Sequence, residues 1–380
     1  MKSDNPNLPV NWIDGMKINK NHFIATDLNV GQQIRNTYSS FINPYNYGLL
    51  LQNSAQKEGA NVVLDIDNQG FVHAKVINCS AVTRGGIRIE IKENYFTDKE
   101  LAESLPAVTL NAETNQKQAY YIALNVNINE RVPFGVPNAD EVPPRLPFIL
   151  PGFHLSVHEV NNLNTIRSEN ALVLGKLIFK GDKPELDEEY IPPCQTIYSH
   201  SKLVEYHAQL LKVLGQIEID IISILKRIKD KKQSTNIAET VADVANSLLI
   251  FMDVYLIEFR NMAKYYPPVF IFEQMAALAR NINNSINKQS TADREEMLNY
   301  IQDWSNLKQG EFEEMLVRAI EYKYDHDDIS KSINGLAPFV NSISKVFNTL
   351  SNLDFIGKKK DRQIFVKEQK EKPGNSFLVD

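Results

Sequence analysis

The chain changes character at residues 190–203, which read YIPPCQTIYSHSKL. Before this stretch, short apolar runs are separated by Asn, Gly, Asp and Pro, which is typical of antiparallel strands. After it, apolar residues recur at helical spacing. Pro192 and Pro193 mark the boundary between the two patterns. The sequence therefore predicts an α+β, multidomain protein, with an N-terminal antiparallel β-sandwich followed by an α-helical bundle.

Five runs in the first half have the length and composition of strands. They are NVVLDI (61–66), GGIRIEI (85–91), AYYIALNVNI (119–128), HLSVHEV (154–160) and LVLGKLIF (172–179). Residues 132–151 contain six prolines, and proline cannot donate a hydrogen bond to a sheet ladder. We predict a long exposed loop or edge excursion there, which is either a binding surface or a passive spacer. Pro143 and Pro144 are its candidate partner contacts.

An unbroken heptad runs from residue 203 to residue 228. Isoleucine-rich a and d layers favour three or four strands over two, which makes these residues candidates for the core of a trimer. An intramolecular four-helix bundle uses similar spacing and is the alternative. The a and d residues are Leu203, His207, Leu210, Leu214, Ile217, Ile221, Ile224 and Ile228.

The sequence carries no signature of a catalytic residue, a cofactor site or a metal site. Its densest polar cluster, residues 324–328 (YDHDD), comes directly before a predicted helix, where Asp and His are expected to cap the helix. The net charge of −6 at pH 7 argues against nucleic acid as a partner, because a surface that tracks phosphates needs a basic excess. A polar N-terminus and the absence of a long apolar segment predict a soluble cytoplasmic protein. The lack of catalytic signatures predicts that it is not an enzyme.

Four separated segments resemble one family. They are residues 10–23 (VNWIDGMKINKNHF), 190–203, 266–280 (YPPVFIFEQMAALAR) and 324–336 (YDHDDISKSINGL). Their order and spacing are similar to those of the TssK family of type VI secretion baseplate subunits. Asp14 stands where Glu is usual in that family, and residues 19–21 (NKN) replace a usual Pro-Gln step.

This resemblance implies a β-sandwich shoulder related to phage receptor-binding proteins, a helical neck and a homotrimer. Such trimers link the baseplate wedge, made of TssF and TssG with TssE, to the membrane complex at the inner face of the inner membrane. In the family the N-terminal part faces the wedge. The resemblance therefore makes Trp12, Met16, His22 and Phe23 candidate wedge contacts. For the side chains of Trp12 and Phe23 themselves, we expect a buried structural role rather than direct contact with the wedge.

Members of the family continue past the late helix into a head domain that contacts the membrane complex, whereas residues 354–380 alone follow Leu353 here. This departure suits a divergent, Bacteroidetes-like subtype with a different membrane anchor. The basic tail either docks on that anchor or on anionic lipid, or it is a soluble tail. Its candidate contacts are Lys358, Lys359, Lys360 and Arg362.

We therefore expect four regions: an N-terminal arm (1–24), a β-sandwich shoulder domain (25–192), a helical bundle neck domain (193–353) and a basic C-terminal tail (354–380). The predicted function is that of a non-catalytic trimeric adaptor, which binds the wedge and links it to a membrane-anchored complex. A phage-tail-like receptor-binding or tail adaptor protein and a hydrolase with a β-sandwich domain are the alternatives.

Overall fold

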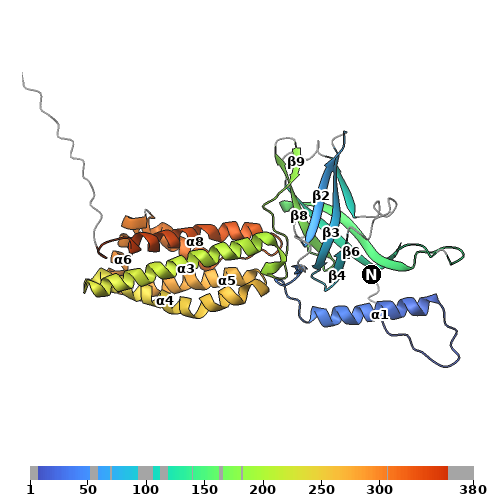
Figure 1. The fold of residues 1–380 in the computed structure, drawn as a ribbon, viewed down its shortest axis with the longest axis horizontal. Coiled ribbons are helices and arrows are strands. Elements are labelled where there is room, and N and C mark those ends of the chain that lie inside the picture. The colour runs from blue at the N-terminus through green and yellow to red at the C-terminus, as the bar shows by residue number, and fades with distance from the viewer. Residues whose placement is uncertain are drawn as a thin grey trace, which may run out of the picture.

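The computed structural model describes residues 7–51, 59–68, 71–92, 106–111, 119–138, 140–161, 166–180, 183–305 and 307–357. Figure 1 shows an elongated molecule with a bundle of helices at one end and a sheet domain at the other. The predicted α+β class is confirmed, since the strands precede residue 190 and a series of helices follows it.

Two antiparallel sheets form the sheet domain. One has the order β1-β3-β2, with β4 and β5 also pairing with β3, and the other has the order β7-β6-β8-β9. Side chains of β3 alternate between half-buried and buried, as expected when one face of a strand packs on a core. The strands are β1 (Gly48–Leu49), β2 (Ala60–Ile66), β3 (Phe71–Val82), β4 (Arg88–Ile91), β5 (Ala107–Asn111), β6 (Tyr120–Phe134), β7 (Phe148–Glu159), β8 (Ala171–Lys180) and β9 (Lys183–Leu186).

Strands β6 and β7 continue beyond the sheet as a two-stranded ribbon. β8 pairs with β6 as far as Asn125, whereas β7 pairs with β6 as far as Phe134. Of the two forms predicted for residues 132–151, the structure shows the edge excursion rather than one long loop, because strand pairing extends through Pro133 and Pro151 and the connection is shorter. Among the described strands, none pairs with the outer side of this ribbon, so each proline can lie on an edge where no ladder hydrogen bond is needed from it.

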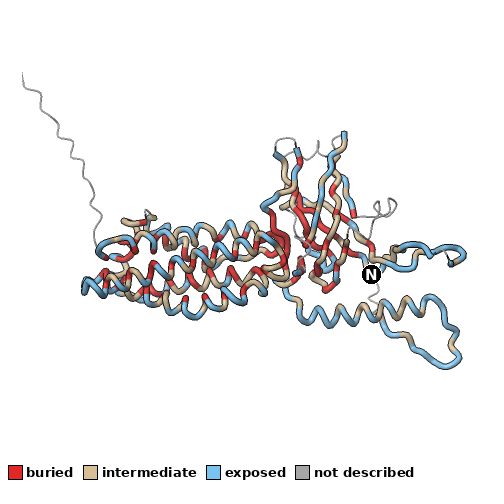
Figure 2. The backbone as a smooth tube through the Cα atoms, in the orientation of Figure 1, coloured by how far each residue is buried: buried red, intermediate tan, exposed pale blue. Residues whose placement is uncertain are grey.

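The bundle packs its long helices side by side around a buried core, which Figure 2 shows in red along the inner faces. Helix α8 runs without interruption through Gly335 and Pro338. Gly335 is needed for packing, since a Cβ atom there would lie 2.4 Å from the ring of Tyr322. The helices are α3 (Ser201–Asp230), α4 (Asn236–Asn261), α5 (Val269–Asn287), α6 (Thr291–Ser305), α7 (Gln309–Ile320) and α8 (Ile329–Ser351), with short 3-10 turns η3 (Ile197–Ser199) and η4 (Ala263–Tyr265).

Strand β1 joins the two parts of the molecule. The backbone N–H of Leu49 donates to the carbonyl of Pro193 over 2.8 Å, and the N–H of Gln195 donates to the carbonyl of Leu49 over 2.9 Å. The boundary segment thus lies alongside β1 like a further strand. Gly48 has φ +109°, and a Cβ atom there would lie 2.1 Å from the carbonyl oxygen of Pro193. Glycine is the residue that this close approach requires.

Candidate protein interface

An N-terminal helix and the arm before it present apolar side chains to solvent. Helix α1 (Lys20–Ser39) has no buried residue, and Figure 2 shows it in tan and pale blue throughout. Phe23, Val30 and Ile34 are seven and four residues apart, so they share one face of α1. We call the following exposed residues the arm–α1 surface: Leu8, Trp12, Ile13, Ile18, Phe23, Val30, Ile34, Tyr38 and Phe41.

Polar contacts hold α1 in place without covering that surface. Arg131 in β6 forms an ion pair with Asp27 of α1 at 3.4 Å, and the side chain of Asn29 donates to the backbone carbonyl of Asn7 in the arm over 2.6 Å. In Figure 1, α1 lies alongside the sheet domain rather than within it. The predicted boundary between the arm and the shoulder domain, at residue 24, falls inside α1. This helix was not predicted from the sequence.

The arm–α1 surface has the composition of a protein-binding site. Trp12 is 50% exposed, Phe23 59% and Ile34 62%. Single exposed apolar side chains are ordinary, but a run of them along one helix and its adjoining arm marks an interaction surface. Aromatic residues, especially Trp and Tyr, dominate the binding energy of such surfaces. Fully burying one large apolar side chain contributes about 1.5–3 kcal/mol.

The arm residues singled out from the sequence have different roles. The predicted buried role of Trp12 and Phe23 is wrong, since both side chains are exposed. His22 caps the start of α1, because its Nδ1 accepts the backbone N–H of Asn19 at 3.2 Å in a capping box. The ring of Trp12 meets the ring of His22 edge-on at 5.9 Å. Met16 is half-buried in the turn before the helix.

Pro143 and Pro144 lie exposed in the loop of the β6–β7 ribbon. Figure 1 places this loop at the end of the sheet domain that is remote from the bundle, the same end as the arm. Two apolar side chains nearby are also uncovered: Val142 in the loop is 97% exposed, and Phe148 at the start of β7 is 65% exposed. The arm and the ribbon loop thus share one end of the molecule.

A second group of side chains joins the sheet domain to the bundle. At its centre, Asp327 Oδ1 accepts from the hydroxyl of Tyr47 at 2.5 Å, and Oδ2 accepts from Nε of Arg167 at 2.9 Å. Arg84 donates to the Tyr47 hydroxyl over 2.6 Å, and the Tyr190 hydroxyl donates to the backbone carbonyl of Asp327 over 2.7 Å. With the neighbouring His326, we call these residues the junction cluster.

Burial sets the protonation states in the junction cluster. It lowers the pKa of His326 to about 4. The neutral ring is held by two hydrogen bonds, with Nε2 donating to the carbonyl of Tyr47 at 2.9 Å and Nδ1 accepting from the Tyr324 hydroxyl at 2.8 Å. Burial, and then the charge of Asp327, raise the pKa of Tyr47, so its hydroxyl stays a donor.

Asp328 plays the predicted capping role at the start of α8. Its Oδ1 accepts the backbone N–H of Lys331 at 3.0 Å, and its Oδ2 accepts from the hydroxyl of Tyr121 in β6 at 3.0 Å. The YDHDD segment therefore caps one helix and binds the sheet domain at once. Within the described residues, no three His, Cys, Asp or Glu side chains are placed to hold one metal ion.

Comparisons with known proteins give one consistent likeness. No family model and no curated protein matches the chain. A crystal structure of TssK aligns with 90% of this chain and 69% of its own length, at 15% sequence identity and a TM-score of 0.53. The chain has a TssK-like fold. Two further alignments have lower TM-scores. A TssK–TssF–TssG baseplate subcomplex of the type VI secretion system gives a TM-score of 0.42 at 13% sequence identity, over 90% of this chain and 98% of the other chain. A baseplate complex of the type VI secretion system gives a TM-score of 0.47 at 12% sequence identity, over 90% of this chain and 99% of the other chain. The fold assignment rests on the first alignment.

The eight heptad residues of α3 lie inside this TssK-like bundle. All are buried within a single chain, from 0% exposure at Ile221 and Ile224 to 9% at Ile228. His207 stacks on Phe259 of α4 and its Nε2 lies 2.8 Å from the Phe259 carbonyl. The intramolecular alternative is therefore the one that the structure shows for these side chains, and they cannot line an axis between copies in this conformation.

The predicted tail contacts, Lys358, Lys359, Lys360 and Arg362, lie outside the described residues.

Proposed function

We propose that this chain is a non-catalytic, trimeric adaptor of a type VI secretion baseplate, and that its arm–α1 surface binds the wedge proteins TssF and TssG. The observation that carries the proposal is this uncovered apolar surface on a TssK-like fold. The solved baseplate subcomplex contains TssK together with TssF and TssG, which supplies the class of partner.

In the proposed adaptor, each part of the molecule has its own role. The arm and the ribbon loop lie at one end, α1 runs from there along the sheet domain, and together they bind the wedge. The junction cluster holds the bundle at a fixed angle to the sheet domain, because a fully hydrogen-bonded buried polar network permits one arrangement of its partners. Binding at one end then positions whatever the bundle holds at the other end. We place the protein in the cytoplasm, on the inner side of the membrane complex.

Capture of the wedge proteins by tagged chain from its native cells tests this proposal. The variant Phe23→Asp with Ile34→Asp is expected to weaken capture at least about 100-fold, because two buried apolar contacts of about 1.5 kcal/mol or more are lost. Val317→Asp is the matched control, since Val317 is a 43% exposed aliphatic residue on the bundle. Wild-type chain that captures no wedge protein would overturn the adaptor proposal. Undiminished capture by the double variant would overturn the assigned surface.

The membrane side of the adaptor is proposed at the basic tail. A chain that lacks residues 357–380 should recruit less of the membrane-anchored partner while it keeps the same number of chains in the oligomer as the wild type. Equal recruitment by both chains would exclude the tail as the contact.

A further inference from the structure

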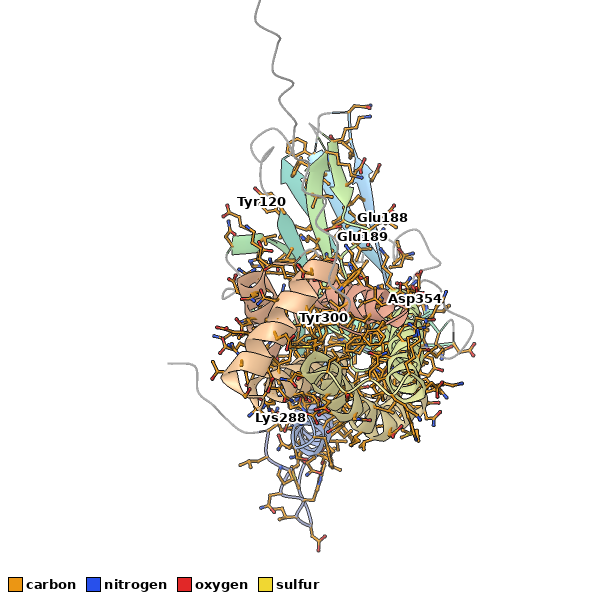
Figure 3. All side chains as sticks on the ribbon, turned by 90° about the vertical axis from the view of Figure 1, so that its left-hand side faces the viewer. Tyr120, Glu188, Glu189, Lys288, Tyr300 and Asp354 are labelled. Carbon is orange, nitrogen blue, oxygen red and sulfur yellow. The ribbon has the colours of Figure 1, made fainter. Side chains whose placement is uncertain are left out.

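A cleft opens between the two sheets where the sheet domain meets the first turn of α3. Its volume is about 420 Å³, which lies in the range of about 300–1,000 Å³ that is usual for ligand sites. β2 and β8 line opposite sides of it, and the loop between β9 and α3 supplies further lining. Figure 3 shows Glu188 and Glu189 of this loop just above the bundle, whereas α1 lies below it. The cleft is therefore separate from the arm–α1 surface.

One side of the cleft is the free edge of β2. β2 pairs with β3, and no other described strand pairs with it. Ala60, Asn61 and Val62 all line the cleft, although side chains of successive strand residues point to opposite faces of a sheet. A cavity that reaches all three residues runs along the edge of the strand rather than over one of its faces.

The same edge of the sheet already accepts an extended segment nearby. β1 and β2 pair with the same side of β3, opposite β4. Beside β1, this edge is occupied by the boundary segment, in which the Pro193 carbonyl and the Gln195 N–H bond to the backbone of Leu49. Leu49 and Pro192 also line the cleft. Beside β2, the cleft thus lies where a further strand would continue the sheet.

β2 lacks the features that usually keep an edge strand from pairing with another chain. Proline, lysine and short length protect such strands. β7 and β9, the edge strands of the other sheet, contain Pro151 and Pro184. β2 has seven residues, ANVVLDI, with neither proline nor lysine. Its edge can therefore accept a strand from a second molecule.

A histidine in the cleft offers a hydrogen bond that suits a peptide carbonyl. Nδ1 of His200 accepts the backbone N–H of Lys202 at 3.2 Å. Burial lowers the pKa of His200 to about 4, so the ring is neutral at pH 7 and its proton is on Nε2. The ring lines the cleft, and Nε2 has no hydrogen-bond partner among the described residues. This N–H group is free to donate to a ligand.

The charged groups at the cleft are already paired. Nζ of Lys176 lies 3.3 Å from a carboxylate oxygen of Asp187, and Nζ of Lys202 lies 2.8 Å from one of Glu189. A charged ligand would have to displace one of these partners. The ligand that fits is therefore uncharged, and apolar side chains line the rest of the space. These are Leu49, Val62, Leu174 and Leu186.

We infer that the cleft binds an extended, uncharged segment of a wedge protein, which adds a strand to the free edge of β2. The inference rests on the proposed function for the identity of the partner, whereas the cleft and the edge of β2 supply the class of ligand. Main-chain hydrogen bonds to β2 provide affinity, and alternate side chains of the segment enter the apolar lining. The wedge then holds the sheet domain at two separate places.

Photo-cross-linking in the native cells identifies the segment. A benzophenone amino acid in place of Glu188, an exposed residue of the lining, is expected to cross-link to one short stretch of TssF or TssG. The same group in place of Glu239, an exposed glutamate in the first turn of α4, is the control and should not reach that stretch. No cross-link at position 188, or a cross-link to this chain itself or to a protein outside the wedge, would overturn the inference.

A variant that fills the cleft tests the same contact by capture. Ser201→Trp places a large ring at an exposed lining position and should weaken capture of the cross-linked protein about 10-fold or more, the factor for one or two lost main-chain hydrogen bonds. Lys212→Trp, at an exposed position of α3 outside the lining, should capture normally. Undiminished capture by Ser201→Trp would overturn this inference and leave the adaptor, whereas a wild-type chain that captures no wedge protein would overturn the adaptor as well.

Synthetic peptides test strand addition with the unaltered full chain. In an added strand, successive N–H groups point alternately toward β2 and away from it. N-methylation of single amides in the cross-linked stretch should therefore weaken binding about 5-fold or more at alternate positions and little at the positions between them. Equal losses at every position, or no loss at any, would overturn strand addition.

Discussion

The junction cluster and the arm–α1 surface depart from the usual pattern of polar outside and apolar inside, in opposite directions. The cluster puts charged and hydroxyl groups in the interior, with the side chain of Asp327 8% exposed. The arm–α1 surface puts Trp12, Phe23 and Ile34 in solvent. Buried polar groups with every bond made select one geometry within the molecule. Exposed apolar groups contribute to stability when a second molecule covers them. The first region is therefore expected to govern folding and the second to govern binding.

Removing Asp327 should have the largest effect on stability. Asp327→Ala leaves Arg84, Arg167 and Tyr47 without their shared acceptor, and breaking such a buried network costs about 3–5 kcal/mol. The lower end applies because the two arginine side chains remain 32% and 42% exposed. Urea unfolding measures the loss. Asp65→Ala, at an exposed position of β2, should change the free energy of unfolding by under about 0.5 kcal/mol; equal losses in both variants would contradict the role of the cluster.

The backbone at the junction should tolerate change nearly as poorly. Gly48→Ala combines a positive φ with a Cβ atom 2.1 Å from the Pro193 oxygen, which together cost about 3 kcal/mol. Gly215→Ala is the control, because nothing lies within 4 Å of its Cβ position in α3. There alanine should stabilise the helix by up to about 1 kcal/mol. The two melting temperatures should move in opposite directions.

Acid should weaken the junction in a way that depends on His326. The folded-state pKa of about 4 lies below the ordinary value of 6.5, so the unfolded chain binds the proton first. Stability is present above pH 6.5 and is lost as the pH falls toward 4, by about 2 kcal/mol between pH 7 and pH 5. His326→Gln should flatten this dependence. His200, with a pKa also lowered to about 4 by burial, should contribute the part that remains, so a completely unchanged profile would contradict the assignment.

Polar substitutions on the arm–α1 surface should have the smallest effect on folding. Phe23→Asp with Ile34→Asp removes no buried contact, since α1 has no buried residue, and the free energy of unfolding should change by under about 0.5 kcal/mol. The same variant is expected to lose wedge binding. A large loss of stability would show that this face packs within the chain and would erase the contrast between the two regions.

Local patterns predicted much of the architecture. The alternating runs correspond to β2, β4, β6, β7 and β8, and the prolines at 192 and 193 lie where the strands give way to helices. The heptad of α3 correctly identified a packed helix, but the same spacing serves packing within a chain and between chains. Whether a helix of the same chain or of another chain packs against the apolar face of α3 depends on where α4 and α8 lie. The sequence of α3 alone does not determine that.

The two functional regions carried weaker signals. α1 contains three charged residues and many amides, and none of its residues is buried. It therefore lacks the broad apolar stripe by which a core helix is recognised in a sequence. The Asn19–His22 pair was the available sign of its start. The partners of Asp327 lie far away in the chain, with Tyr47 separated from it by 280 residues. No periodicity links such positions, so the YDHDD segment could be read as a cap but not as a connection between domains.

The length of the bundle has a consequence of its own. α3 starts at the junction and contains 30 residues, which at about 1.5 Å per residue gives a rod of about 45 Å. Because the junction fixes one end of this rod, the bundle acts as a ruler that sets the gap between whatever docks at its free end and whatever the arm holds. Re-scaling that gap would require matched insertions in several antiparallel helices at once. The spacing should therefore change more slowly in evolution than the surfaces at either end.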